Sequence, residues 1–93
     1  MSKLEEQAVR LVKELLPDFQ KLEFKATIGD SSHSIEFFVW VNHNRYQCYE
    51  LVENGNIDEI KMESLFDAYA DSFRSSDEYK KGEVNRVHFI IET

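Results

Sequence analysis

The chain is poor in the residues that interrupt or cross-link a fold. Its 93 residues include one cysteine, one proline and three glycines. The single Cys48 cannot form an internal disulfide, which agrees with a reducing compartment. So little glycine and proline excludes collagen-like sequences and flexible linkers. No apolar run approaches the roughly 18 residues that a membrane-spanning helix requires.

The start of the chain also lacks the apolar segment that directs secretion. Acids stand at Glu5 and Glu6, where a signal peptide would be hydrophobic. We therefore expect a cytoplasmic protein. Hydrophobic residues make up 42% of the chain and aromatic residues 13%, which is enough to build a packed core. The length fits a single domain over residues 1–93.

Positive charge is scarce, and the scarcity is confined to one segment. The chain carries 18 acids and 11 bases, a formal net charge of -7. Residues 50–78 hold nine of the acids and two bases, Lys61 and Arg74, whereas the rest of the chain has nine of each. This acidity disfavours nucleic acid and anionic membranes as ligands. We expect one polarised acidic face.

Hydrophobic periodicity predicts a helix followed by three strands. Ser2 followed by Glu5 is a capping box, and apolar residues at helical spacing then run as far as Pro17. Alternating residues predict strands at 21–28, 34–41 and 45–52, with turn residues between them. In this interpretation Cys48 lies in the third strand.

A second apolar stripe predicts another helix after the third strand. Two caps are possible at its start: Asn56 with Glu59, or Asp58 with Ile57 packed back against Met62. A last strand is predicted near residues 87–91. The residues that form the helical stripe are Met62, Leu65, Phe66, Tyr69 and Phe73.

The predicted elements follow the order α-β-β-β-α-β. Each helix has a single apolar stripe to bury, so the simplest arrangement places both helices on one face of a four-stranded antiparallel sheet. We therefore predict an α+β fold of this kind. Phe38 and Trp40 form a patch that is too aromatic for a purely solvated surface, unless the first helix or the end of the chain covers it. The residues expected on the uncovered face are Lys25, Thr27, Phe38, Trp40, His88 and Ile90.

The sequence offers little for catalysis. Its histidines lack the helical pairing or cysteine partners of a metal site, and its isolated glycines form no phosphate-binding loop. Cys48 has no recognisable histidine partner that would make it a nucleophile. We expect no catalytic residue, no metal and no cofactor, and hence a protein that is not an enzyme. A small hydrolase using His88 and Glu36 from neighbouring strands is the enzymatic alternative.

The second predicted helix carries a row of acids on the side away from its apolar stripe. Acids four residues apart repel, and three such pairs destabilise an isolated helix by roughly 1 kcal/mol. Ile60 falls in the middle of this row, and an exposed aliphatic ringed by carboxylates is typical of a protein interface. The alternative is a solvated acidic face, with Ile60 packed against residues 52–55. The acids of the row are Glu59, Glu63, Asp67 and Asp71.

The chain resembles the small immunity proteins of bacterial polymorphic toxin systems, in particular the YezG-like group. The resemblance lies in the element order and in the strand pair at residues 21–40, which includes the stretch from Ile35 to Trp40. It extends to the turn at residues 54–55, the helix around Leu65 with Phe73, and the closing strand at residues 87–92.

The resemblance implies that the chain binds and neutralises one cognate toxin encoded in its own operon. Many such toxins are nucleases of contact-dependent growth inhibition. A basic nuclease cleft holds polyphosphate, so a row of carboxylates offers it a competing polyanion. We expect a monomeric antitoxin that covers the basic cleft of a nuclease, preferably a ribonuclease, with its acidic helix. The expected contact residues are Asp58, Glu59, Ile60, Glu63, Asp67, Asp71, Phe38 and Trp40.

A different class of function fits the same composition. Acidic α+β proteins of this size also serve as secretion or assembly chaperones that act as dimers. In that case the face with Phe38, Trp40 and Ile90 would hold the client or form the dimer contact.

Overall fold

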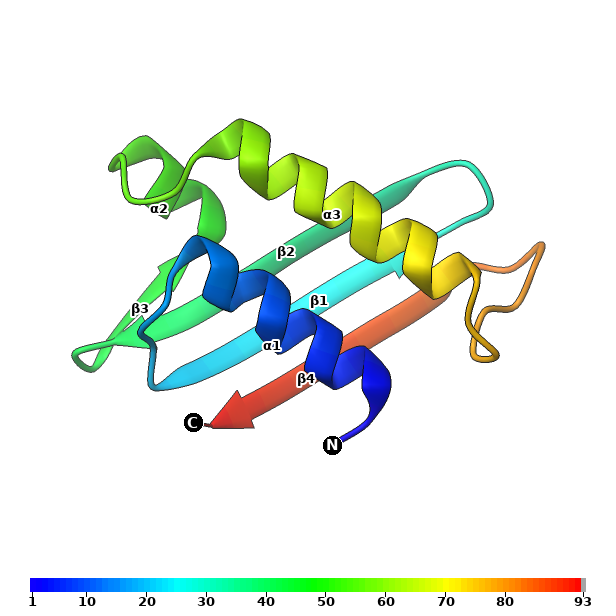
Figure 1. The fold of residues 1–93 in the computed structure, drawn as a ribbon, viewed down its shortest axis with the longest axis horizontal. Coiled ribbons are helices and arrows are strands. Elements are labelled where there is room, and N and C mark those ends of the chain that lie inside the picture. The colour runs from blue at the N-terminus through cyan, green and yellow to red at the C-terminus, as the bar shows by residue number, and fades with distance from the viewer. Residues whose placement is uncertain (93) are drawn as a thin grey trace.

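The computed structural model describes residues 1–92 and has an α+β architecture (Figure 1). Two long helices, α1 (Lys3–Leu15) and α3 (Glu59–Arg74), lie over the same face of one sheet. The predicted fold class and element order are therefore confirmed. Within residues 1–92 no helix has both the length and the apolar character needed to cross a bilayer. The strands are β1 (Lys21–Ile28), β2 (His33–Val41), β3 (Asn44–Gln47) and β4 (Asn85–Glu92).

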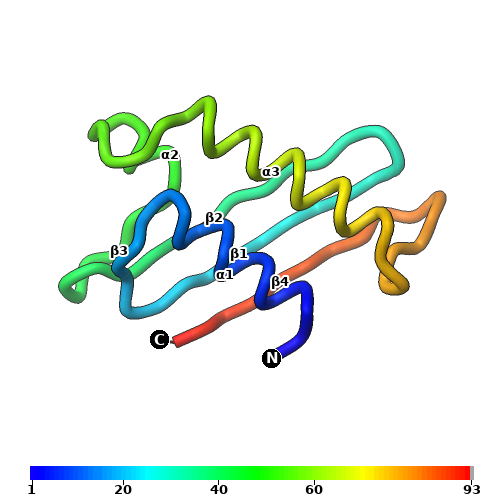
Figure 2. Tube along the Cα trace, in the orientation of Figure 1, coloured from blue at the N-terminus to red at the C-terminus, as the bar shows by residue number. Residues whose placement is uncertain are grey.

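The sheet is antiparallel, with the strand order β3-β2-β1-β4. β1 pairs along its whole length with β2 on one side and with β4 on the other. Figure 2 shows β1 and β4 side by side although most of the chain separates them. A two-residue turn joins β2 to β3, and its residues Asn42 and His43 have positive φ angles of 51° and 68°. Such turns match the twist of the paired strands.

The first helix begins and ends as the sequence predicts. The Ser2 hydroxyl accepts a hydrogen bond from the Glu5 N–H at 3.1 Å, and the Glu5 carboxylate accepts one from the Ser2 N–H at 3.4 Å. The helix ends at Leu15, since Leu16 is extended before Pro17. The residues that it buries are Ala8, Leu11 and Val12.

The third strand is shorter than predicted. β3 ends at Gln47, and the chain then forms a short helix, α2 (Cys48–Glu53). The prediction of a strand over residues 45–52, with Cys48 inside it, is therefore wrong.

Local capping and packing explain this difference. The Gln47 side chain accepts a hydrogen bond from the Tyr49 N–H, and the Glu50 carboxylate accepts one from the Gln47 N–H. These reciprocal bonds form a helix cap. Cys48 and Leu51, three residues apart, are both buried, which a helix allows and a strand does not. The weak alternation of the segment is outweighed by these interactions.

The start of α3 resolves the choice between the two predicted caps. The Asp58 carboxylate accepts hydrogen bonds from the Ile60 and Lys61 N–H groups at 3.0 and 3.3 Å. Ile57, just before this cap, is buried. The apolar stripe of α3 faces the sheet as predicted, with Leu65 at its partly buried margin. Its buried members are Met62, Phe66, Tyr69, Ala70 and Phe73.

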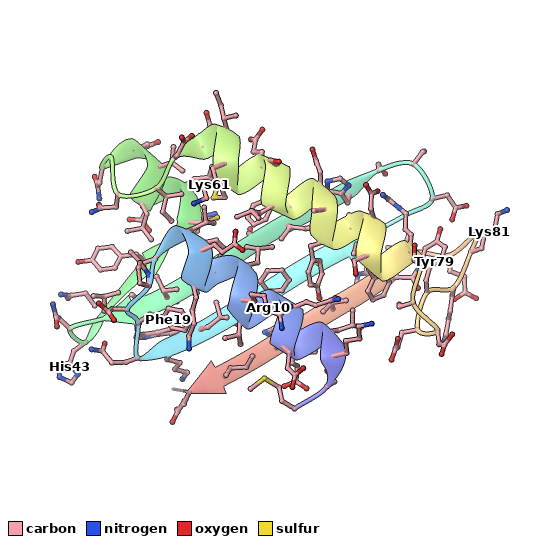
Figure 3. The ribbon with its side chains drawn as sticks, in the orientation of Figure 1. Arg10, Phe19, His43, Lys61, Tyr79 and Lys81 are labelled. Atoms are coloured by element: carbon pink, nitrogen blue, oxygen red, sulfur yellow. The ribbon has the colours of Figure 1, made fainter. Side chains whose placement is uncertain are left out.

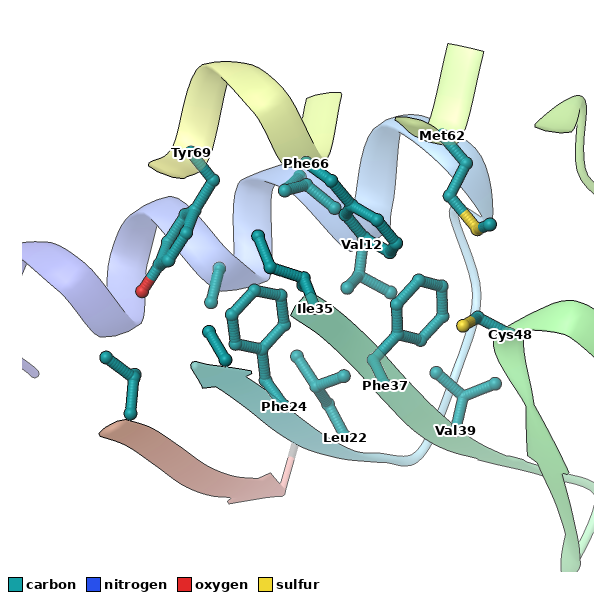
Figure 4. Packing of buried hydrophobic residues seen from close by; sticks show 14 of the residues in the cluster. Val12, Leu22, Phe24, Ile35, Phe37, Val39, Cys48, Met62, Phe66 and Tyr69 are labelled. Carbon is teal, nitrogen blue, oxygen red and sulfur yellow. The ribbon is translucent and has the colours of Figure 1, made fainter. Parts of the chain in front are cut away.

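The core fills the space between the helices and the sheet (Figure 4). Aromatic rings meet edge to face across it, with centroids 4.9 Å apart for Phe24 and Tyr69 and 6.1 Å apart for Phe37 and Phe66. These pairs join β1 and β2 directly to α3, so they fix the height of α3 above the sheet.

Arg74 fixes the far end of α3 against the β1–β2 hairpin. Its guanidinium donates hydrogen bonds to the carbonyl oxygens of Gly29 at 2.9 Å and Ser32 at 3.0 Å. The same hairpin is tied to the loop after α3, because the Asp30 carboxylate accepts hydrogen bonds from the Tyr79 hydroxyl and the Gly82 N–H. α3 is therefore held at a defined position over β2.

We expect truncation of Phe24 to cost far more stability than truncation of Phe38. Phe24→Ala opens a cavity in the core and should lower the free energy of unfolding by about 3–5 kcal/mol. Phe38→Ala, on the other face, should cost only about 1–2 kcal/mol. Urea unfolding of both variants tests the one-sided core, and equal losses would contradict it.

Candidate functional site

α3 carries an exposed acidic surface opposite its buried stripe. We call Asp58, Glu59, Ile60, Glu63, Asp67 and Asp71 the acidic ridge, and all six are exposed. Ile60 is 83% exposed. Its predicted exposure among carboxylates is therefore confirmed, and the alternative in which it packs against residues 52–55 is wrong.

The carboxylates of the ridge differ in their partners. Asp67 lies 2.9 Å from His33 Nε2, and Asp71 lies 3.2 Å from a guanidinium nitrogen of Arg74. Both remain accessible, because their side chains are 69% and 78% exposed. Within residues 1–92 no ion pair involves Glu59 or Glu63. The ridge therefore keeps most of its negative charge directed at solvent.

The two bases of the acidic segment are used elsewhere. The Lys61 ammonium donates a hydrogen bond to the Glu14 carbonyl at the end of α1, at 3.3 Å. Figure 3 labels Lys61 where α3 passes that end of α1. Arg74 binds two carbonyls of the β1–β2 hairpin and reaches only Asp71 on the ridge. The neighbouring bases thus hold α3 in place and leave Glu59 and Glu63 without compensation.

A polar cavity lies beside the ridge, between α3 and the edge of β2. Its volume is about 290 Å³, and we call it the edge cavity. Burial raises the pKa of the Tyr49 phenol there, and the neighbouring Cys48, Glu63, Glu59 and Glu36 raise it further. The lining residues are His33, Ser34, Ile35, Glu36, Tyr49, Glu63, Phe66 and Asp67.

Sequence reasoning missed Glu36, Tyr49 and His33 as neighbours of the ridge. Glu36 belongs to β2 and Tyr49 to α2, so the sequence separates both from α3. No local sequence pattern could have shown these neighbours, because they depend on the direction in which α3 crosses β2, and a helical wheel does not contain that direction. The third strand predicted over residues 45–52 would also have occupied this space.

Phe38 and Trp40 lie on the other side of the molecule from the ridge. They occupy the sheet face away from the helices, so burial under α1 is excluded. The Arg45 guanidinium lies 3.9 Å from the Phe38 ring centroid, and the Lys21 ammonium lies 4.9 Å from that of Trp40. These cations partly cover the aromatic pair. The eight predicted contact residues therefore belong to two separate surfaces.

The structure does not bring together the pair of the hydrolase alternative. His88 is on β4 and Glu36 on β2, and β1 lies between those strands. His88 Nε2 instead contacts the Glu23 carboxylate at 2.7 Å. Burial raises the pKa of the Cys48 thiol, which disfavours the thiolate. Among residues 1–92 no three histidine, cysteine or acidic side chains are grouped so that they could hold a metal ion.

Comparisons of the chain with protein-family models, curated proteins and solved structures give no match. The resemblance to immunity proteins therefore rests on the residues themselves and stays a prediction.

Replacing Glu63 by lysine should stabilise the protein. Glu63 lies four residues from both Glu59 and Asp67, so Glu63→Lys converts two repulsive pairs into attractive ones. We expect the free energy of unfolding in urea to rise by about 1 kcal/mol. Ser64→Lys, an exposed change on the same helix, is the matched control and should have a smaller effect. A loss of stability in Glu63→Lys would show that the ridge is not under repulsion.

The contact between His88 and Glu23 should make stability depend on pH. The hydrogen bond from His88 holds the pKa of Glu23 below its ordinary value, and Lys25 and Arg45 lower it further, although burial acts in the opposite direction. A carboxyl with a lowered pKa stabilises the folded chain above its unfolded pKa of about 4.3, and this stabilisation is lost as the pH falls through the folded pKa.

We therefore expect Glu23→Gln to lose less stability than the wild type on acidification. The measurement is the free energy of unfolding in urea at a series of pH values below about 5. Glu6→Gln on α1 removes a carboxyl far from His88 and should keep the wild-type profile. Identical profiles for Glu23→Gln and the wild type would contradict the assignment.

Proposed function

We propose that this chain is an immunity protein, which binds a toxin domain and covers its basic active-site cleft. The observation that carries the proposal is the acidic ridge, with Ile60 fully presented among carboxylates and with Glu59 and Glu63 free of ion pairs within residues 1–92. The proposed target is a nuclease, preferably a ribonuclease, because such an enzyme must attract polyanions.

The arrangement of the ridge supports binding more than solubility. Acids repeat every four residues along α3, about 6 Å apart, and each pair destabilises the helix. A surface needed only for solubility would tolerate mixed charges at lower cost. An exposed Ile60 likewise costs solubility and contributes only when a partner buries it.

Electrostatic complementarity gives the proposal a mechanism. Opposite potentials raise the rate at which two proteins meet and orient them before contact. Rapid capture protects the producing cell, because free toxin causes damage before slow binding is complete. Ile60 then supplies an apolar anchor that slows dissociation.

The chaperone alternative is less favoured. It needs the sheet face with Phe38 and Trp40 to be an apolar docking surface, but Arg45 and Lys21 lie over these rings. Among residues 1–92, Ile90 is the one large apolar residue on that face that counts as exposed, at 59%. One such residue makes a small apolar surface for a client or a dimer contact.

The test measures association with the toxin domain encoded beside this chain, at several salt concentrations. We expect the double variant Glu63→Lys with Asp67→Lys to associate at least about tenfold more slowly at low salt, and to lose most of the salt dependence. Cells that express the toxin should lose protection with this variant.

The matched control is Asp18→Lys with Glu83→Lys, which changes the net charge equally at exposed positions outside α3. It should retain most of the association rate and full protection. Equal effects of the two double variants would mean that net charge, and not the ridge, governs binding. Unchanged binding and protection in the ridge variant would exclude the proposal.

A further inference from the structure

β2 has strand partners on both sides over only half of its length. β3 pairs with residues 38–41 and then ends, because the chain leaves the sheet at Cys48 to form α2. Beside residues 33–37 no other described strand lies on that side of β2. The position in line with β3 is therefore unfilled, and we call it the open lane. An unpaired strand edge is a template for another strand.

The backbone of β2 presents hydrogen-bonding groups to the open lane. The Trp40 carbonyl faces β1, because it accepts the Gln20 N–H at 2.8 Å. Backbone groups alternate along a strand, so those of His33, Ile35 and Phe37 face the lane. The Phe37 backbone is hydrogen-bonded to the thiol of the first residue of α2. His33 and Ile35 therefore offer donors and acceptors with which no strand of residues 1–92 pairs.

The edge cavity opens onto this lane. Glu63 and Asp67 of α3 lie above it, and Tyr49 of α2 closes the end where β3 stops. The cavity volume of about 290 Å³ leaves space beside the backbone of β2.

Carboxylates flank the open lane on both faces of the sheet. Glu36, opposite Lys25 in the register, belongs to the uncovered face, whereas Glu63 and Asp67 belong to the helix side. Successive side chains of a strand point to opposite faces. A strand in the lane would therefore direct one side chain towards Glu36 and the next towards Glu63 and Asp67.

We propose that the open lane takes an extended segment of the toxin by strand addition to β2, with lysine or arginine at two adjacent positions of that segment. The proposal rests on the proposed function for the identity of the partner and specifies how the partner is held. Main-chain hydrogen bonds to His33 and Ile35 set the register, and the carboxylates on the two faces select the basic side chains.

A second copy of this chain fits the lane poorly. Pairing of two β2 edges would bring Glu36 and the carboxylates of the ridge towards their own copies, and like charges across a strand pair are destabilising. A basic segment has the complementary charge on both faces.

The probe is a six-residue peptide with blocked ends, Thr-Val-Lys-Arg-Val-Thr, added to the isotope-labelled full chain. We expect saturable binding, with hydrogen exchange of the Ile35 amide slowed by about tenfold at saturation. Because the peptide is unlabelled, only the amides of the protein are observed in this measurement. Two further peptides carry N-methyl groups at alternate positions, one set on odd residues and the other on even residues.

Strand addition uses only one of these two sets of peptide amides. One N-methylated peptide should therefore lose at least about tenfold in affinity while the other retains binding. Glu36→Gln should weaken the unmodified peptide without lowering the free energy of unfolding. Equal binding of both N-methylated peptides, or no binding at millimolar concentration, overturns the proposal.

The toxin complex separates this proposal from the proposed function. A complex that protects cells but leaves exchange at Ile35 unchanged overturns strand addition and supports the immunity function. Binding of one N-methylated peptide with no binding of the toxin supports the lane as a site for basic segments and removes the toxin as their source.

Discussion

The structure depends on one constraint: a four-stranded sheet has two faces, and the two long helices cover only one. Most aliphatic and phenylalanine side chains of β1, β2 and β4 therefore share a face, with Phe38 and Ile90 as the exceptions, and the stripes of α1 and α3 must turn towards it. This orientation decides where the charges go. Once the stripe of α3 points to the sheet, its acids point to solvent, and the other face of the sheet is left to polar and charged side chains of both signs around Phe38 and Trp40.

The contacts that position α3 also preserve its charge. Lys61 reaches the end of α1 and Arg74 reaches the β1–β2 hairpin, so the bases closest to the acids are engaged with backbone carbonyls. Aromatic contacts from Phe24 and Phe37 hold the same helix from below. Packing and electrostatics are thus linked: the contacts that hold α3 in place also engage the bases nearest to its carboxylates.

Local signals in the sequence predicted most of the fold. The capping box at Ser2, the stripe of α1 and the alternation in β1 are each decided by neighbouring residues, and each was found correctly. The prediction after Gln47 failed because it followed a weak alternation and missed the local cap formed by Gln47 and Glu50, while the burial of Leu51 depends on the core. The exposure of Ile60 followed from helical geometry. The edge cavity did not, because it exists only where β3 stops, α2 departs and α3 passes overhead.

The cations over Phe38 and Trp40 have a consequence for how the whole molecule behaves in an electric field. Lys21 also lies 4.0 Å from Glu92, and Arg45 lies 3.7 Å from Glu23, so these cations are compensated on the sheet face that they occupy. Glu59 and Glu63 of the ridge, in contrast, have no ion pair within residues 1–92. The uncompensated negative charge of the protein is therefore concentrated along α3. Salt at 0.1 M screens electric fields beyond roughly 10 Å. A cationic surface within that distance attracts the carboxylates of the ridge and exerts a torque that turns α3 towards it.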